Sequence, residues 1–365
     1  MKHGISHKKY NGHKVYRDVV DPYNPLGLPP YTIRLKYAEG VTPTFWKGTA
    51  VQVSSSPNVW DLTYSNNWNL ILDDQTELIE VLGANSTGVT SMRSMFDGCF
   101  SLTSVALFDT SKVTDMYGFF FECYSLASAP LFDTRNVTRM DQMFYRCNSL
   151  TSVPLFDTRN VTIMNEMFNG CSSLATVPLF NTSNVTKMSE MFRDCTSLTT
   201  IPLFNTSSVT QMGLMFAGCS SLTSIPLFNT SLVSNMIGAF SGCSSLTTVP
   251  LFDASNWDNM YTTFAGCISL SSVPLFNTNK VTNMNLAFSQ CKSLTSIPLF
   301  NTSEVSGMQS TFDGCTNVQN GALALYQQAS TQTNPPGYHS EAFKNCGINT
   351  QTGSAELAQI PAGWK

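Results

Sequence analysis

Residues 171–192 read CSSLATVPLFNTSNVTKMSEMF, and nearly the same pattern returns 24 residues later. The shift places Cys171 on Cys195, Pro178 on Pro202 and Phe192 on Phe216. Written as V-T-x-M-x-x-M-F-x-x-C-x-S-L-T-S-V-P-L-F-D/N-T-x-x, the unit recurs ten times, from Val89, Val113, Val137, Val161, Val185, Val209, Val233, Trp257, Val281 and Val305. A fixed period of this length indicates one long solenoid rather than the two domains that 365 residues would otherwise suggest.

The two halves of the unit carry different apolar patterns. In the first half Val, Met, Met or Phe, and Cys recur at helical spacing, which favours a short helix with one buried face. In the second half Leu174, Val177 and Leu179 are typical of a strand whose large aliphatic residues point inward. We therefore predict an α/β repeat solenoid, in which 24-residue coils of strand plus short helix stack into a leucine-rich-repeat-like rod with a parallel sheet.

The consensus SLTSVPLFDTSNVTxMxxMFxxC resembles the BspA-like leucine-rich repeats, which also occur in mycoplasma lipoproteins, surface proteins of gut bacteria and gut phage genomes. The resemblance covers about residues 78–346. It implies a curved solenoid used for adhesion or recognition at a surface, and it implies no enzyme activity.

Four regions are expected along the chain. Residues 1–30 form an N-terminal tail, either disordered or docked onto a larger assembly. Residues 31–77 contain three alternating segments and form a small β-rich cap, residues 78–318 form the solenoid, and residues 319–365 form a mixed C-terminal cap. That last cap is expected to contain a helix within residues 321–331 and to close on Leu357, Ile360 and Trp364.

The composition argues against several classes of function. Hydrophobic residues make up 42% of the chain, charged residues 12%, and the net charge is −4, so no basic stripe is available for nucleic acid. No apolar run approaches the roughly 18 residues of a membrane span. The first residues lack the apolar core of a signal peptide, so either a leader is missing or the protein reaches its destination without one.

The cysteines occupy one position of the repeat: Cys99, Cys123, Cys147, Cys171, Cys195, Cys219, Cys243, Cys267, Cys291 and Cys315, with Cys346 in the same context after an insertion. We predict buried free thiols that pack as small apolar groups, in preference to disulfides or zinc ligands. Three histidines lie in the tail and His339 stands alone, and no nucleophile with a base or pair of unlike carboxylates is visible. We expect no enzyme activity, metal or cofactor.

Positions that differ between coils are free of the packing requirement, so they are candidates for recognition. In the first three coils they carry aromatic residues, which most later coils replace with Ser, Ala, Asn or Thr. Exposed aromatic side chains suit sugar stacking or protein contact, although they could instead pack beneath the N-terminal cap. The predicted ligand-binding residues are the anchors Phe100, Tyr117, Phe121, Tyr124 and Tyr145, with Arg135, Arg139, Asp141 and Arg146 as polar contacts.

A second candidate surface comprises the proline positions from Pro130 to Pro298 and the phenylalanine positions from Phe108 to Phe300. If side chains along the strand alternated strictly between inward and outward, these residues would lie on the outer face as an apolar strip or an oligomer interface. Their invariance between coils favours the alternative, in which proline bends the strand so that Phe turns inward.

These observations predict a non-enzymatic recognition module outside a virion or cell. The preferred hypothesis is a phage or prophage virion component that binds a host-cell surface glycan or protein, attached through its N-terminal tail. Alternatives are a bacterial surface adhesin whose leader has been removed, and a structural spacer or decoration protein without a ligand. Neither nucleic-acid binding nor membrane insertion is expected, and the oligomeric state stays open.

Overall fold

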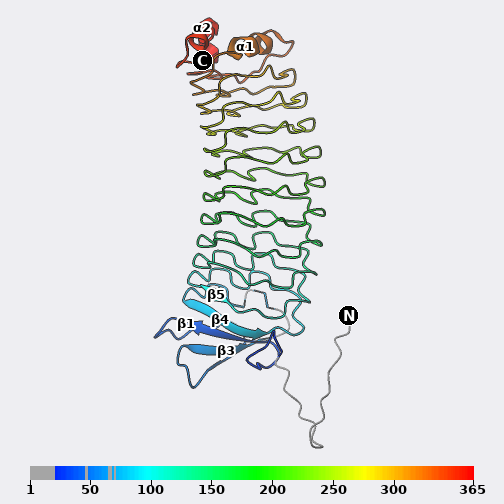
Figure 1. The fold of residues 1–365 in the computed structure, drawn as a ribbon, viewed down its shortest axis with the longest axis vertical. Coiled ribbons are helices and arrows are strands. Elements are labelled where there is room, and N and C mark those ends of the chain that lie inside the picture. Colours follow the sequence, from blue (N-terminus) through cyan, green and yellow to red (C-terminus); the bar gives the residue numbers. More distant parts are fainter. Residues whose placement is uncertain (1–20, 46–47, 65–67, 70) are drawn as a thin grey trace, which may run out of the picture.

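The computed structural model describes residues 21–45, 48–64, 68–69 and 71–365. The chain forms an elongated rod of stacked coils, with a sheet at the N-terminal end and two helices at the C-terminal end (Figure 1). The expected docking tail falls mostly on residues 1–20, which lie outside the described residues. Residues 21–30 form turns ahead of the first strand.

The N-terminal sheet continues directly into the first coil. It contains β1 (Thr32–Tyr37), β2 (Thr49–Gln52), β3 (Val59–Thr63), β4 (Leu78–Asn85) and β5 (Ser104–Val105), in the order β2-β3-β1-β4-β5. Strand β1 is antiparallel to β3 and β4, whereas β4 is parallel to β5. Because Val81 lies opposite Val105, the β4–β5 pair already has the 24-residue register of the repeat.

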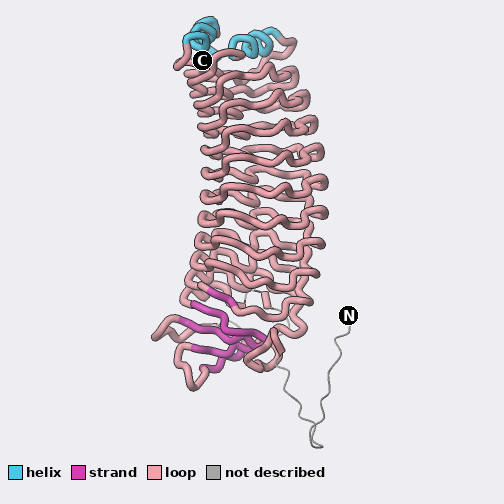
Figure 2. Tube along the Cα trace, in the orientation of Figure 1, coloured by secondary structure: helices cyan, strands magenta, loops and turns pink. Residues whose placement is uncertain are grey.

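The predicted short helix in each coil is wrong, because the structure describes these segments as consecutive turns (Figure 2). Two residues per coil, such as Glu166 (φ 55°) and Gly170 (φ 77°), adopt a left-handed conformation that a right-handed helix does not tolerate. Backbone N–H groups at alternate positions donate to the next coil instead of within a helix: Met164 to Lys187, Glu166 to Ser189, Phe168 to Met191 and Gly170 to Arg193, at 2.7–3.1 Å.

The strand half of the coil also differs from the prediction. Beyond β5, the strand half of the described coils forms only the isolated parallel bridges Thr248–Ser272 and Ser296–Asn320, and the other bridges between coils, such as Ile163–Lys187, lie in the methionine half. Proline removes one N–H from the ladder, and the N–H of Phe180 donates to the carbonyl of Pro178 at 3.0 Å, which curls the chain. As a result Phe180 is buried, as favoured from its invariance, but Leu179 is 59% exposed rather than inward.

The core runs unbroken along the rod because each coil contributes the same buried side chains. Phe192 stacks between Phe168 and Phe216, with ring centroids 5.6 and 5.7 Å apart. Buried threonines form a second ladder, in which the hydroxyl of Thr158 donates to the carbonyl of Asn181 at 2.9 Å. Successive coils are therefore held together by both stacking and hydrogen bonds, as expected of a solenoid.

All eleven cysteines are free and buried, which confirms the prediction for the thiols. The structure adds that the ten cysteines from Cys99 to Cys315 also donate hydrogen bonds: Sγ of Cys171 lies 3.0 Å from the carbonyl oxygen of Phe144 in the preceding coil. Burial raises the pKa of the Cys171 thiol well above its usual value. The same cause raises the pKa of Cys267 to about 12, so these thiols stay protonated and unreactive at neutral pH.

The C-terminal end of the rod is closed by α1 (Ala322–Thr331), α2 (Gln351–Gln359) and a 3₁₀ turn, Ala362–Trp364. Phe343 extends the phenylalanine ladder by stacking on Phe312 at 5.7 Å. Trp364 then stacks on Phe343 at 6.4 Å and on His339 at 4.2 Å. The last apolar rings of the ladder are thereby covered, and Trp364 itself is buried.

Candidate functional site

Two pairs of aromatic rings stack across successive coils near the N-terminal end of the rod. Phe100 and Tyr124 lie 4.9 Å apart at 13°, and Phe121 and Tyr145 lie 4.5 Å apart at 6°. The members of each pair are 24 residues apart, so the repeat itself places one ring over the next. All four side chains are half-buried. We call these rings, together with Tyr117, the aromatic edge.

Tyr117 lies among arginines. The guanidinium carbon of Arg93 is 3.9 Å from the centre of its ring and that of Arg139 is 5.3 Å away, which are cation–π distances. Arg139 also donates two hydrogen bonds, at 3.1 and 2.8 Å, to the buried carboxylate of Asp141. Burial raises the pKa of Tyr117, so its hydroxyl is neutral and able to donate at physiological pH.

An ion pair lies beside the second stacked pair. Arg146 Nη1 is 3.0 Å from Glu122 Oε1, and its guanidinium carbon is 5.4 Å from the centre of the Tyr145 ring. Both Glu122 (φ 56°) and Arg146 (φ 55°) adopt the left-handed conformation that favours glycine. Six other coils carry glycine at this position: Gly98, Gly170, Gly218, Gly242, Gly266 and Gly314. The fold therefore does not require charged residues here, and the backbone tolerates some strain to display them.

Eight of the nine residues predicted from the sequence lie on or beside the aromatic edge, and Arg135 is the exception. Arg135 pairs with Asp133 at 2.7 Å and lines a separate hollow with Tyr23, Leu131 and Arg159. Sequence reasoning missed Arg93 and Glu122. Arg93 occupies in the first coil the position that Tyr117 occupies in the second. Glu122 occupies the position directly before the cysteine, which also varies between coils. Comparing each of these two positions across the coils could therefore have found both residues.

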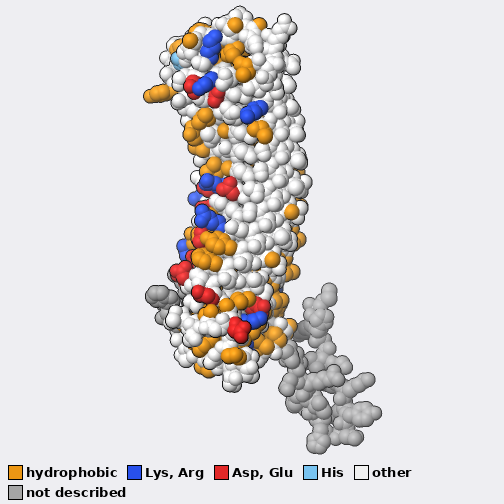
Figure 3. All heavy atoms as spheres, turned by 90° about the vertical axis from the view of Figure 1, so that its left-hand side faces the viewer, with side chains coloured by type: hydrophobic (Ala, Val, Ile, Leu, Met, Phe, Trp, Pro, Cys, Tyr) orange, Lys and Arg blue, Asp and Glu red, His pale blue; other side chains and the backbone are white. Residues whose placement is uncertain are grey.

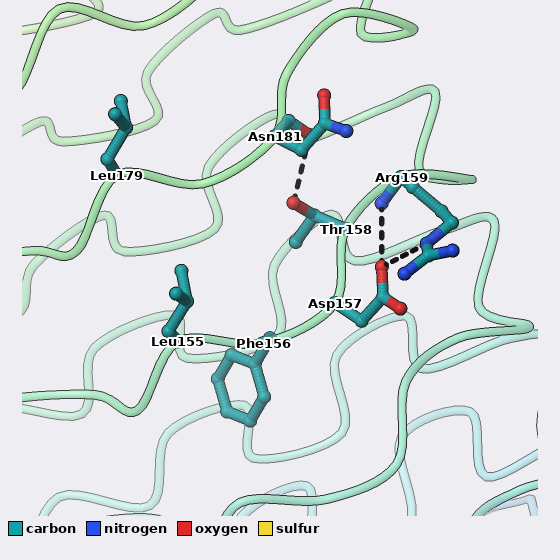
Figure 4. A pocket seen from close by; sticks show the side chains of 7 residues that line it. All are labelled: Leu155, Phe156, Asp157, Thr158, Arg159, Leu179 and Asn181. Carbon is teal, nitrogen blue, oxygen red and sulfur yellow. Dashed lines mark hydrogen bonds and ion pairs between the residues drawn. The ribbon is translucent and has the colours of Figure 1, made fainter. Parts of the chain in front are cut away.

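The described surface also has two shallow hollows between coils. Figure 4 shows the first, lined by Leu155, Phe156, Asp157, Thr158, Arg159, Leu179 and Asn181. Its charges are paired with each other, because Arg159 Nε donates to Asp157 Oδ1 at 2.9 Å. Figure 3 shows that charged side chains gather toward one side of the face it presents, whereas neutral polar groups cover much of the rest.

No group of three or more His, Cys, Asp or Glu side chains within the described ranges could hold a metal ion. None of the helices in that part of the chain is long and apolar enough to cross a membrane.

Asp97 provides a pH-dependent test of the region beside the aromatic edge. Burial, and then the nearby carboxylates of Asp73, Asp74 and Glu122, raise the pKa of Asp97 to about 6. The folded state therefore holds this proton more tightly than the unfolded state, and stability falls as pH rises from about 4 to about 6. We expect Asp97→Asn to stabilise the protein near pH 7 by about 1 kcal/mol, after allowance for solvent screening of a half-exposed group.

The gain should be almost lost near pH 4 and vanish below about pH 3, where Asp97 is protonated in both states. Asp253→Asn is the control, because hydrogen bonds from Ser255 lower the pKa of Asp253. Thermal melting of both variants across this pH range checks the prediction. A gain for Asp97→Asn that is independent of pH would contradict it.

Some solved structures are distantly similar to this chain. This chain matches a leucine-rich repeat protein from Eubacterium ventriosum ATCC 27560 with a TM-score of 0.44 and 16% identity, over 73% of this chain and 85% of the other. It matches the protein in a TLR13–ssRNA13 complex with a TM-score of 0.29 and 13% identity, over 71% of this chain and 44% of the other. No curated protein matches the sequence.

A family model described as "Mycoplasma protein of unknown function, DUF285" matches residues 69–177, 149–248, 172–273 and 222–325. These overlapping matches span the cysteine and phenylalanine positions of the coils and more than half of the chain. They agree with the repeat type that the sequence indicates. The chain belongs to this family of repeat proteins, the DUF285 family.

Proposed function

We propose that this protein is a non-enzymatic recognition module that binds a cell-surface glycan or protein through the aromatic edge. The observation that carries the proposal is the contrast between coils that share one framework. At the positions of the two stacked pairs, the first three coils place Phe or Tyr, whereas the coils from residue 161 onward carry no aromatic residue there, mostly Asn, Ser, Ala or Thr, although stacking continues in the same way along the rod. The rings are therefore not required by the repeat itself.

The chemistry of the aromatic edge suits a sugar better than an extended peptide. Two stacked pairs present flat, partly exposed apolar surface, on which a sugar ring can pack. Arg146 and Glu122 supply an exposed donor and a half-buried acceptor next to Tyr145, which can bind hydroxyl groups. A carboxylated sugar could also pair with Arg93 near Tyr117.

The cellular setting is part of the proposal. A host-binding role on a phage or prophage virion, with residues 1–30 as the attachment point, is the preferred setting. A bacterial surface adhesin is the alternative. In either setting several copies on one particle would turn weak single sites into firm attachment.

The test is a glycan array probed with the wild-type chain and the double variant Tyr124→Ser/Tyr145→Ser. If each ring contributes about 1–2 kcal/mol, the double variant should bind roughly 30-fold to 1,000-fold more weakly. Tyr261→Ser is the matched control, since Tyr261 is an exposed tyrosine of a later coil and should be dispensable. Thermal melting confirms that each variant is folded.

A third variant separates binding from stability. Arg146→Gly introduces the residue that six other coils carry at this left-handed position, so it should melt at or above the wild-type temperature. It should nevertheless bind more weakly, because the ion pair with Glu122 is lost. Unchanged binding by both Arg146→Gly and the double tyrosine variant would contradict the proposal and favour a spacer without a ligand.

A further inference from the structure

A straight ridge of exposed leucines runs along the rod. It contains one leucine from each of eight successive coils: Leu131, Leu155, Leu179, Leu203, Leu227, Leu251, Leu275 and Leu299. Each is between 52% and 61% exposed, whereas the phenylalanine that follows each one is buried. Leu155 and Leu179 project in the same direction from neighbouring coils (Figure 4). We call this set the leucine ridge.

Most of the leucine ridge is almost free of charge, and at its N-terminal end Leu131 and Leu155 share hollows with the ion pairs Asp133–Arg135 and Asp157–Arg159. From Leu179 to Leu299 the flanking chain comprises residues 175–181, 199–205, 223–229, 247–253, 271–277 and 295–301. In these six segments Asp253 is the single charged residue, and the other residues beside the leucines are Ser, Thr, Asn, Pro and Ala together with the buried Val, Ile and Phe. Such a surface gives no cation for an anionic membrane and no charge pattern for a charged partner.

We propose that the leucine ridge is the interface between two copies of this chain. Coils stack at about 4.8 Å, so a complementary surface must present apolar groups at that interval over eight coils. A second copy carries the same ridge with the same spacing. Because most of the ridge is uncharged and the charges at its N-terminal end are paired with each other, placing two copies face to face brings few like charges together. One surface patch used by both partners is the arrangement of a two-fold dimer.

The size of the leucine ridge is sufficient for such a dimer. Eight leucines that are each more than half exposed, with the half-buried prolines beside them, form an apolar strip on the order of 800 Å². A standard protein interface buries about this area on each partner. The apolar patches of ordinary monomers are smaller, roughly 300–600 Å². The ridge and the aromatic edge occupy different positions of the coil, so this inference does not rest on the proposed function.

The first test is the mass of the protein in solution, measured by light scattering during size exclusion. The wild-type chain, of 40.0 kDa, should elute as a particle of twice that mass. Leu203→Asp should halve the mass, because it buries a charge in the middle of the interface. Leu232→Asp is the matched control, since Leu232 is 53% exposed at another position of the coil, and it should leave the dimer intact.

The second test uses the burial of the native thiols. All eleven native cysteines are buried, so an introduced surface cysteine is the accessible thiol. Leu203→Cys lies near the middle of the leucine ridge and should form a covalent dimer with a short bis-maleimide under native conditions, whereas Leu232→Cys should not. A wild-type protein that is monomeric at about 100 μM overturns the proposal. So does a dimer that survives Leu203→Asp, or a Leu203→Cys protein that gives no covalent dimer.

Discussion

Replacing Phe192 by alanine should lower the free energy of unfolding by about 4 kcal/mol. Its ring is completely buried and stacks on Phe168, Phe216 and Phe204, with centroids 5.6, 5.7 and 6.1 Å away. The substitution removes the apolar contact and leaves a cavity, which hydrogen-bonded neighbouring coils cannot easily close. The effect should reach beyond one coil, because each ring of the ladder supports the rings on both sides.

Urea unfolding followed by circular dichroism measures this loss. Leu232→Ala is the control: it deletes an apolar side chain that is 53% exposed and lies outside the leucine ridge, so it should change stability by less than about 1 kcal/mol. Equal losses for the two variants would show that the phenylalanine ladder is not the core of the rod.

Gly321→Ala should detach the C-terminal cap. Gly321 precedes α1 with φ 96°, a conformation that strains any other residue. An added Cβ would lie 2.1 Å from the carbonyl oxygen of Ile297, so the backbone at the start of α1 would have to move. We expect a loss of about 3 kcal/mol or more, together with rapid proteolysis within residues 322–331.

Gly337→Ala is the matched control, because its added Cβ would meet no atom within 4 Å. It should melt and resist protease like the wild type. A Gly321→Ala protein with unchanged melting and unchanged protease resistance would contradict the placement of α1 against the last coil.

The repeat and its buried positions could be predicted from the sequence because invariance across coils marks what stacking requires. The helix could not be excluded, since apolar residues at spacings of three and four suit both a helix and a series of packed turns. The available signal was glycine at one position of six coils, the position of Gly170, which indicates a left-handed turn. The sequence prediction placed the side chain of Leu179 inside the coil, but it is exposed. An apolar residue fits a strand pattern whether its side chain points inward or outward.

Positions that vary between coils predicted the aromatic edge, because a position that stacking does not fix is free to take part in binding. Variation between coils carries no direction around the coil, so it groups Arg135 with rings from which Arg135 is separate. The sequence prediction chose its anchors among aromatic residues and therefore left out Arg93 and Glu122. Arg93 contacts the ring of Tyr117 and Glu122 pairs with Arg146, and neither contact is visible in the sequence. These contacts follow from packing between coils that a single repeat does not reveal.

We propose that interchangeable coils supply the fold while the edge of the first three coils supplies recognition. The most direct test is the glycan-array profile of a chain that lacks one whole later coil, residues 185–208. This deletion keeps every framework position in register and leaves the aromatic edge untouched. We expect the shortened protein to bind the same glycans as the wild type with the same affinity. A folded shortened protein whose binding is lost or redirected would contradict the claim.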